Sequence, residues 1–126
     1  MTRQQKWAQS AFVAVQKQAK STLEKKYGTY CMKLPSLLLQ SGLVQTTAYL
    51  RSRGEDAAVQ FLNDVAATLR ESKSTGKELD EQARKAPLSE YLRLSRDALQ
   101  VATWFRRFAQ TELEVDVEGG TDARTP

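Results

Sequence analysis

The segment LPSLLLQSGLVQTTAYL, residues 34–50, contains no charged side chain, and Lys33 and Arg51 border it. Its length is close to the minimum for a membrane-spanning helix. It also contains Pro35, Gly42 and several glutamine, serine and threonine residues, which a lipid-exposed span tolerates poorly. We therefore interpret this segment as part of the core of a globular protein.

The same residues predict two short helices joined by a turn. Proline is tolerated in the first turn of a helix, so Pro35 is expected to begin a helix over 35–41. Gly42 suits a stop, and a second helix is expected over about 43–52. The apolar residues expected to pack from these helices are Leu34, Leu37, Leu38, Leu43, Val44, Ala48 and Leu50.

Apolar residues recur at helical spacing on both sides of this segment. The spacing predicts a first helix over about 3–26 that ends at Gly28, and further helices over 55–72, 78–85 and 88–110. The fold is expected to be all-α, a compact bundle of about five or six helices. Further residues expected to be buried are Phe61, Leu62, Val65, Leu94, Val101 and Phe105.

One packed domain is expected over residues 1–110, and an acidic tail over 111–126. The tail carries five acidic side chains against Arg124, and it includes the alternating run ELEVDVE at 112–118. Because this run lies among glycines and charges, we expect the tail to be disordered and not to form a strand.

Histidine is absent from the 126 residues. Its absence removes the commonest general base and the usual zinc ligand. Cys31 is the single cysteine, so no internal disulfide can form. That usage, together with an N-terminus that lacks the pattern of a signal peptide, favours a cytoplasmic protein.

No other pattern assembles an active site. The acidic run ELDE at 78–81 is interpreted as a helix start balanced by Arg84 and Lys85, not as a metal site. The glycines do not form a phosphate-binding loop. We therefore expect no catalytic residue, no metal, no cofactor and no small-molecule substrate.

Basic residues are concentrated in the first part of the chain, where residues 1–33 carry seven Lys and Arg against Glu24, within a net charge of +4. On a helical wheel, basic residues of the helix over 3–26 form a ridge opposite its apolar face, and those of the helix over 88–110 do the same. Such ridges can follow a phosphate backbone, although solvated helix faces remain an alternative. The candidate nucleic-acid-binding residues are Arg3, Lys6, Lys17, Lys20, Arg93, Arg96 and Arg107.

Tryptophan and arginine near the core edge are candidates for contacts with a partner protein. Trp7 and Trp104 lie at the margins of apolar stripes, where an indole N–H can reach water. Arg106 follows Phe105, so one turn of the helix carries both a charged residue and an apolar one. Trp104 and Arg106 are the candidate partner-binding residues.

Two stretches together resemble a known family. YCMKLPSLLLQSGLVQTTAYL at 30–50, followed by EYLRLSRDALQVATWFRRFA at 90–109, resembles the small α-helical subunit of the type III-B CRISPR effector, the Cmr complex. The resemblance implies a non-catalytic subunit that stacks as a filament and lines the channel for guide RNA and target RNA. The implied partners are the backbone and large subunits, further copies of itself and both RNAs, with no membrane.

Three other interpretations remain open. The chain could be a helical protein-interaction module with no nucleic-acid role, which salt-sensitive RNA binding would exclude. It could be the small subunit of another type III complex, with a similar fold and role. A hydrolase that uses carboxylates alone would lose its activity when an aspartate or glutamate is replaced.

Overall fold

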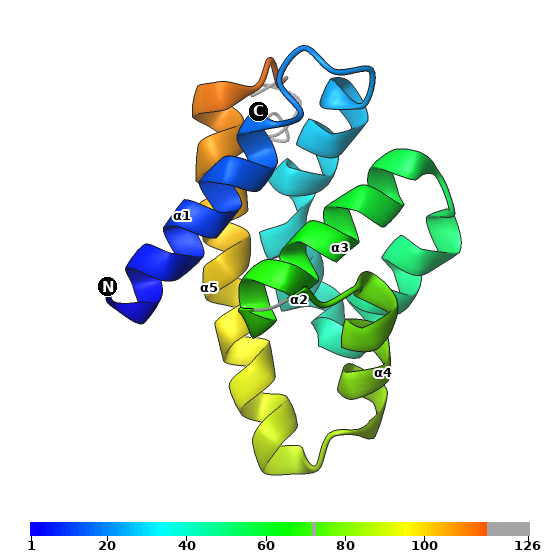
Figure 1. Cartoon of the computed structure of the whole chain (residues 1–126). Helices are drawn as coiled ribbons and strands as arrows, with labels where there is room; N and C mark the ends of the chain where they lie inside the picture. Colours follow the sequence, from blue (N-terminus) through cyan, green and yellow to red (C-terminus); the bar gives the residue numbers. More distant parts are fainter. Residues whose placement is uncertain (72, 116–126) are drawn as a thin grey trace.

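The structure, a computed structural model, describes residues 1–71 and 73–115. These residues form five helices and no strand, which confirms the predicted all-α bundle (Figure 1). Most of the predicted tail lies outside the described residues, so its disorder stays a prediction. The helices are α1 (Arg3–Gln16), α2 (Glu24–Arg53), α3 (Asp56–Arg70), α4 (Gly76–Lys85) and α5 (Leu88–Glu112).

Helix α5 runs along the bundle from the bottom to the top of Figure 1, and α1 crosses it. Helix α3 packs on α1, α2 and α5, whereas α4 contacts α2 and α3. The ring of Phe61 on α3 lies 5.4 Å from that of Tyr27 and 5.9 Å from that of Tyr30, both on α2. It lies 5.8 Å from the ring of Phe105 on α5. These buried rings join three helices in one core.

Helix α1 ends earlier than predicted. Thr2 caps its start in a capping box with Gln5, but the helix stops at Gln16 and not near residue 26. Residues 17–23 form turns that reverse the chain toward α2, and Lys20 adopts a φ of 64°. The backbone N–H of Lys20 donates to a Glu24 carboxylate oxygen at 2.9 Å, which holds the turn.

Gly28 and Pro35 were expected to lie at helix ends, and both lie inside α2. A Cβ on Gly28 would sit 2.5 Å from Val115 Cγ1, so this glycine lets the chain after α5 approach the helix closely. Pro35 cannot donate a backbone hydrogen bond. The helix continues past it because neighbouring side chains, among them Tyr30, Cys31 and Leu34, are buried in the core.

Gly42 is the turn point that the sequence predicted. Its φ of 81° and ψ of 169° break α2 into residues 24–41 and 43–53. The break leaves the backbone N–H of Val44 without a helical carbonyl, and it donates to the Tyr91 hydroxyl of α5 at 3.3 Å. The second part of α2 is therefore fixed to α5 where it begins.

Most of the predicted core is confirmed, with corrections among the leucines, at Trp7 and at Ala48, which was expected to pack and is exposed. Leu37 and Leu38 are only half-buried, and Leu39 beside them is 71% exposed, because this part of α2 lies at the surface. Trp7 was expected at the core margin but is 2% exposed, and its Nε1 has no hydrogen-bond partner among the described residues. The predicted core residues that are buried are Leu34, Leu43, Leu50, Phe61, Leu62, Val65, Leu94, Val101 and Phe105.

Helix α4 is attached to α2 through a buried carboxylate. Asp80, 4% exposed, accepts hydrogen bonds from Thr47 Oγ1 and from Arg51 Nη1, each at 2.9 Å. Arg84 Nε lies 3.5 Å away. Burial acts to raise the pKa of Asp80, but the bonds from Arg51 and Thr47 and the charge of Arg84 lower it overall. Within the run ELDE, Asp80 therefore links two helices.

Candidate nucleic-acid interface

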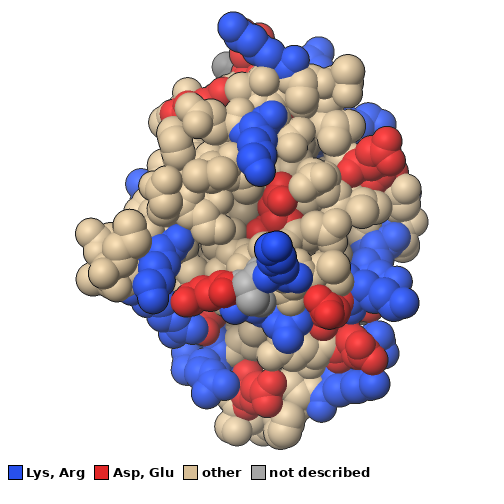
Figure 2. Space-filling model, in the orientation of Figure 1, with Lys and Arg blue, Asp and Glu red and all other residues tan. Residues whose placement is uncertain are grey.

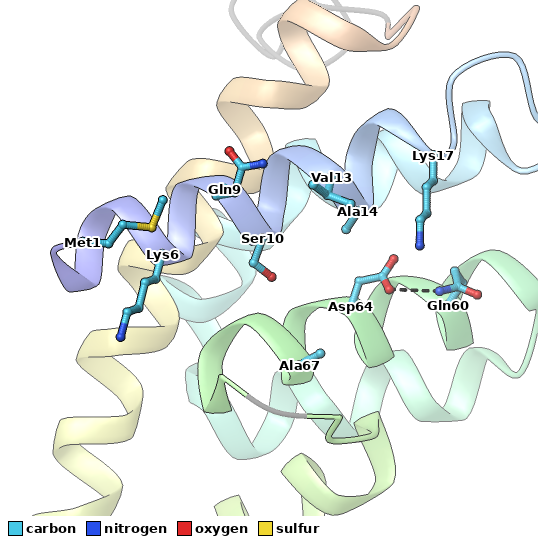
Figure 3. Close-up of a pocket in the computed structure, with 10 residues that line it drawn as sticks. All are labelled: Met1, Lys6, Gln9, Ser10, Val13, Ala14, Lys17, Gln60, Asp64 and Ala67. Atoms are coloured by element: carbon cyan, nitrogen blue, oxygen red, sulfur yellow. Dashed lines mark hydrogen bonds between the residues drawn. The ribbon is translucent and has the colours of Figure 1, made fainter.

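Two of the predicted basic residues, Lys6 and Lys17, line a groove between α1 and α3 (Figure 3). They project from the side of α1 that faces α3, the side on which Ser10 Oγ lies 2.6 Å from Thr68 Oγ1. Since α-helices rise about 1.5 Å per residue, the Cα atoms of the two lysines are about 16 Å apart. The groove therefore carries a cation toward each end.

Asp64 of α3 lies in the same groove, near Lys17 (Figure 3). Its carboxylate accepts hydrogen bonds from the Tyr27 hydroxyl at 2.7 Å and from Gln60 Nε2 at 2.9 Å. Burial raises the pKa of Asp64, although these bonds and the charge of Lys17 act in the opposite direction. The sequence did not indicate this carboxylate, because its partner Tyr27 is distant along the chain. A negative charge thus lies between the two lysines.

Arg3 is engaged inside the molecule. Its guanidinium forms an ion pair with Asp97 of α5 and lies 4.0 Å from a Glu71 carboxylate oxygen. It also covers the Trp7 ring, with the guanidinium carbon 4.5 Å from the ring centroid. Arg3 therefore joins α1 to α5, and acidic side chains balance its charge.

Lys20 is exposed but does not continue the ridge of α1. The wheel placed it on a helix that reached about residue 26, whereas α1 ends at Gln16. Lys20 lies in the following turn, where its direction is set by its positive φ. It remains at the same end of α1 as Lys17, so the two cations can still act together.

Arg107 of α5 lies outside the groove that Lys6 and Lys17 line. Arg93, Arg96 and Arg107 are exposed, and Arg107 lines a shallow pocket between the start of α1 and α5. The side of α1 toward α5 carries Phe12, whose ring lies 5.4 Å from that of Phe108. Lys6 and Lys17 project toward α3 instead. The predicted basic residues Lys6 and Lys17 therefore line one pocket, and Arg107 lines another.

Charges of both signs share the face seen in the surface view. Figure 2 shows Lys and Arg scattered over this face, at its edges and near its middle, with Asp and Glu side chains among them. Within α1 itself, no acidic side chain interrupts the basic ones. The assembled surface differs, because carboxylates such as Asp64 and Asp97 arrive from neighbouring helices.

Both candidate partner-binding residues contact the chain itself. Arg106 is half-buried, and its Nη1 donates to the Met32 carbonyl of α2 at 2.8 Å. Trp104 is partly exposed, and its Nε1 donates to Gln4 Oε1 at 2.8 Å. Gln4 is a residue that the sequence analysis missed, since a glutamine at a helix start carries no distinctive signal. A partner contact by Trp104 or Arg106 stays a prediction.

Three other features concern the described residues: the reactivity of the cysteine, the presence of a metal site and the presence of a membrane-spanning helix. Cys31 is buried, and burial raises the pKa of its thiol, which disfavours the reactive thiolate. Across residues 1–71 and 73–115, no three His, Cys, Asp or Glu side chains gather in a way that could hold a metal ion. In the same part of the chain, no helix has the length and apolar content needed to cross a membrane.

Comparison with known proteins identifies the family. The family model described as CRISPR-associated protein (Cas_Cmr5) matches residues 3–112. The chain belongs to the Cmr5 family. It is 43% identical over 113 residues to the CRISPR system Cmr subunit Cmr5 of Thermus thermophilus, an alignment that covers 90% of this chain and 97% of that relative. The resemblance seen in the sequence is confirmed.

The fold agrees with a solved Cmr5 structure. The X-ray crystal structure of a CRISPR-associated Cmr5 family protein from Thermus thermophilus matches with a TM-score of 0.85 and 42% identity. The match covers 90% of this chain and 100% of that chain. The Cmr5 family model begins at the first residue of α1 and ends at the last residue of α5, so it includes every predicted basic residue.

Proposed function

We propose that this chain is the small, non-catalytic subunit of a cytoplasmic Cmr ribonucleoprotein of type III-B CRISPR defence. Copies of it stack as a filament beside the backbone and large subunits and line the channel for guide RNA and target RNA. Membership of the Cmr5 family supports the assignment to the complex. The RNA role rests on the exposed cations.

The proposed RNA role rests on which basic side chains form ion pairs with carboxylates of the chain and which do not. Arg3 is held by carboxylates of the chain. No ion pair within residues 1–71 and 73–115 involves the side chains of the other predicted residues. Exposed cations without a carboxylate partner can neutralise phosphates and release counterions. These cations are Lys6, Lys17, Lys20, Arg93, Arg96 and Arg107.

The placement of the cations in different pockets has a consequence for how RNA is held. Because Lys6 and Lys17 line one pocket and Arg107 lines another, an RNA strand that follows the lysines leaves Arg107 available for a neighbouring strand. Each pocket contacts few phosphates, so an isolated subunit should bind RNA weakly. Stacked copies link several such contacts, and linked sites raise the effective concentration of each.

Replacing Lys17, Lys20 and Arg96 with Ala in the assembled complex should flatten the dependence of log K on log salt by about 2. The expectation follows from about 0.7 per phosphate contact for single-stranded nucleic acid. All RNA sequences should be weakened alike, because phosphate contacts do not depend on base identity. RNA affinity measured across a salt series, on preparations with the subunit content checked, tests this.

The matched control replaces Lys26, Arg53 and Lys85, which lie beside Glu55, Glu55 and Glu81. This control removes the same charge but should leave the salt slope unchanged. An unchanged slope in the test variant with full retention of the subunit would contradict the RNA role. Loss of the variant from the complex, with the slope of the remaining assembly preserved, would instead assign these residues to protein docking.

The purified chain is expected not to cleave RNA, DNA or nucleotides, with or without Mg²⁺ or Mn²⁺. The reason is chemical: the chain has no histidine, and its single thiol is held protonated by burial. Incubation with labelled RNA and analysis of the products tests the expectation. Metal-dependent turnover that disappears in Asp56→Ala or Glu78→Ala would show that this part of the proposal is wrong.

A further inference from the structure

We propose that the pocket between the start of α1 and α5 binds a nucleobase of single-stranded RNA, stacked on Trp104. The pocket is lined by Gln4, Gln100, Thr103, Trp104 and Arg107. The inference rests on the proposed RNA role and adds a base contact to it. Three features carry it: a supported aromatic ring, an oriented amide donor and a cation.

Trp104 is a partly exposed ring that its neighbours hold in place. It stacks on Phe108, with the ring centroids 5.7 Å apart and the planes at 19°. Phe108 in turn meets Phe12 of α1 edge to face, at 5.4 Å and 79°. A ring supported from behind and open to a pocket presents a flat surface, which is the arrangement that stacks unpaired bases in single-strand-binding proteins.

Hydrogen bonds orient the amides beside this ring. An indole N–H can only donate, so the bond from Trp104 fixes Gln4 Oε1 as its acceptor. Gln4 Nε2 therefore faces Gln100 Oε1, to which it donates. The acceptor of Gln100 is thus occupied, and its Nε2 is left to donate to a ligand. The complementary edge of a base is one that presents acceptors, such as the carbonyl oxygens of uracil.

Arg107 supplies the charge that a nucleotide requires. It lies one turn beyond Thr103 and lines the same pocket. No ion pair within the described part of the chain engages it. An aromatic surface, a donor and a guanidinium match the base, its carbonyl edge and the phosphate of one nucleotide. RNA is the proposed occupant, and because Trp and Arg are also common in protein interfaces, a partner protein is one outcome of the test.

The chain carries two tryptophans, which makes the test direct. Trp7 is buried, so Trp7→Phe leaves Trp104 as the sole fluorescent indole. Full-length Trp7→Phe protein is titrated at low salt with oligouridylate and with an abasic ribose-phosphate strand of equal length. Oligouridylate should quench Trp104 and bind more tightly than the abasic strand. Trp104→Ala should weaken oligouridylate binding, followed by anisotropy of a labelled strand, about tenfold.

Further variants distinguish a loss of base binding from a folding defect. Gln100→Ala removes an exposed amide donor and should weaken the binding of oligouridylate, whose carbonyl oxygens can accept from that amide, while Trp104 is still quenched. Gln110→Ala, also exposed on α5 but outside the pocket, should change neither quantity.

Several results would overturn the inference. Binding of oligouridylate without a change in Trp104 emission, or equal affinity for the abasic strand, rejects the base site and leaves the phosphate contacts intact. Failure of the isolated chain to bind either strand also rejects it, whereas the salt slope of the assembled complex judges the proposed function separately. If Trp104→Ala drops out of the complex with its own RNA affinity unchanged, the pocket holds a protein partner.

Discussion

Phe105→Ala is expected to lower the free energy of unfolding by about 3–5 kcal/mol. Phe105 is completely buried in the C-terminal third of α5, and its ring meets Phe61 edge to face. Truncation would remove the apolar contacts and leave a cavity where α2, α3 and α5 join. Since small domains are stable by roughly 5–15 kcal/mol, the variant should unfold at a much lower urea concentration.

The matched control for this variant is Leu92→Ala on the same helix. Leu92 is half exposed, so its truncation should cost less than about 1 kcal/mol. Both values come from urea titrations followed by far-ultraviolet circular dichroism. A loss below about 1 kcal/mol for Phe105→Ala would mean that the aromatic cluster is not the centre of the core.

Asp80→Ala is expected to cost about 2 kcal/mol at neutral pH, because hydrogen bonds to charged groups contribute about 1.5–3 kcal/mol each. Asp80 holds α4 to α2 through Thr47 and Arg51. The expected loss of unfolding free energy lies toward the lower end of that range because the guanidinium groups of Arg51 and Arg84 are partly exposed. Water can hydrate them when Asp80 is removed. Glu81→Ala, which breaks an exposed pair with Lys85, is the control and should leave the urea midpoint nearly unchanged.

The effect of Asp80 should depend on pH in a defined direction. Its folded-state pKa is lowered, so its contribution is fully present above the unfolded value of about 3.9 and is lost as pH falls through the folded value. The difference in unfolding free energy between the wild type and Asp80→Ala should therefore be constant from neutral pH to about pH 5 and shrink in more acidic buffer. A difference that grows as pH falls would contradict the assignment.

The helices with one continuous apolar face were predicted well from the sequence. Helices over 55–72 and 88–110 were expected, and the structure has Asp56–Arg70 and Leu88–Glu112. Each of these helices buries a single stripe, and Pro87 immediately precedes the second. In such segments the local pattern and the tertiary packing favour the same structure, so periodicity is sufficient.

Helix α2 was predicted less well because local rules and packing disagree there. Gly28 and Pro35 are typical of helix ends, yet α2 continues past both of them. Burial of side chains such as Tyr27 and Cys31 stabilises the helix there. The glycine is needed for contact with Val115, which lies far along the chain. Contacts of that kind cannot be inferred from spacing alone.

The candidate interface shows the same limit. A helical wheel indicates which side chains point away from the core, and Lys6, Lys17, Arg93, Arg96 and Arg107 are indeed exposed. It cannot indicate what a neighbouring helix brings beside them. Asp97 neutralises Arg3, and Asp64 lies in the groove that Lys6 and Lys17 line. The spacing of residues in the sequence predicts neither contact.

The break at Gly42 also affects the dynamics of the chain. The Val44 amide is bonded to the Tyr91 side chain and not to a carbonyl of its own helix, so fraying of residues 43–53 does not by itself release it. Its hydrogen exchanges with solvent when α5 separates from α2, an opening that also exposes the core between them. When the interface recloses quickly, the exchange rate of this one amide therefore reports the free energy of opening the contact between two helices.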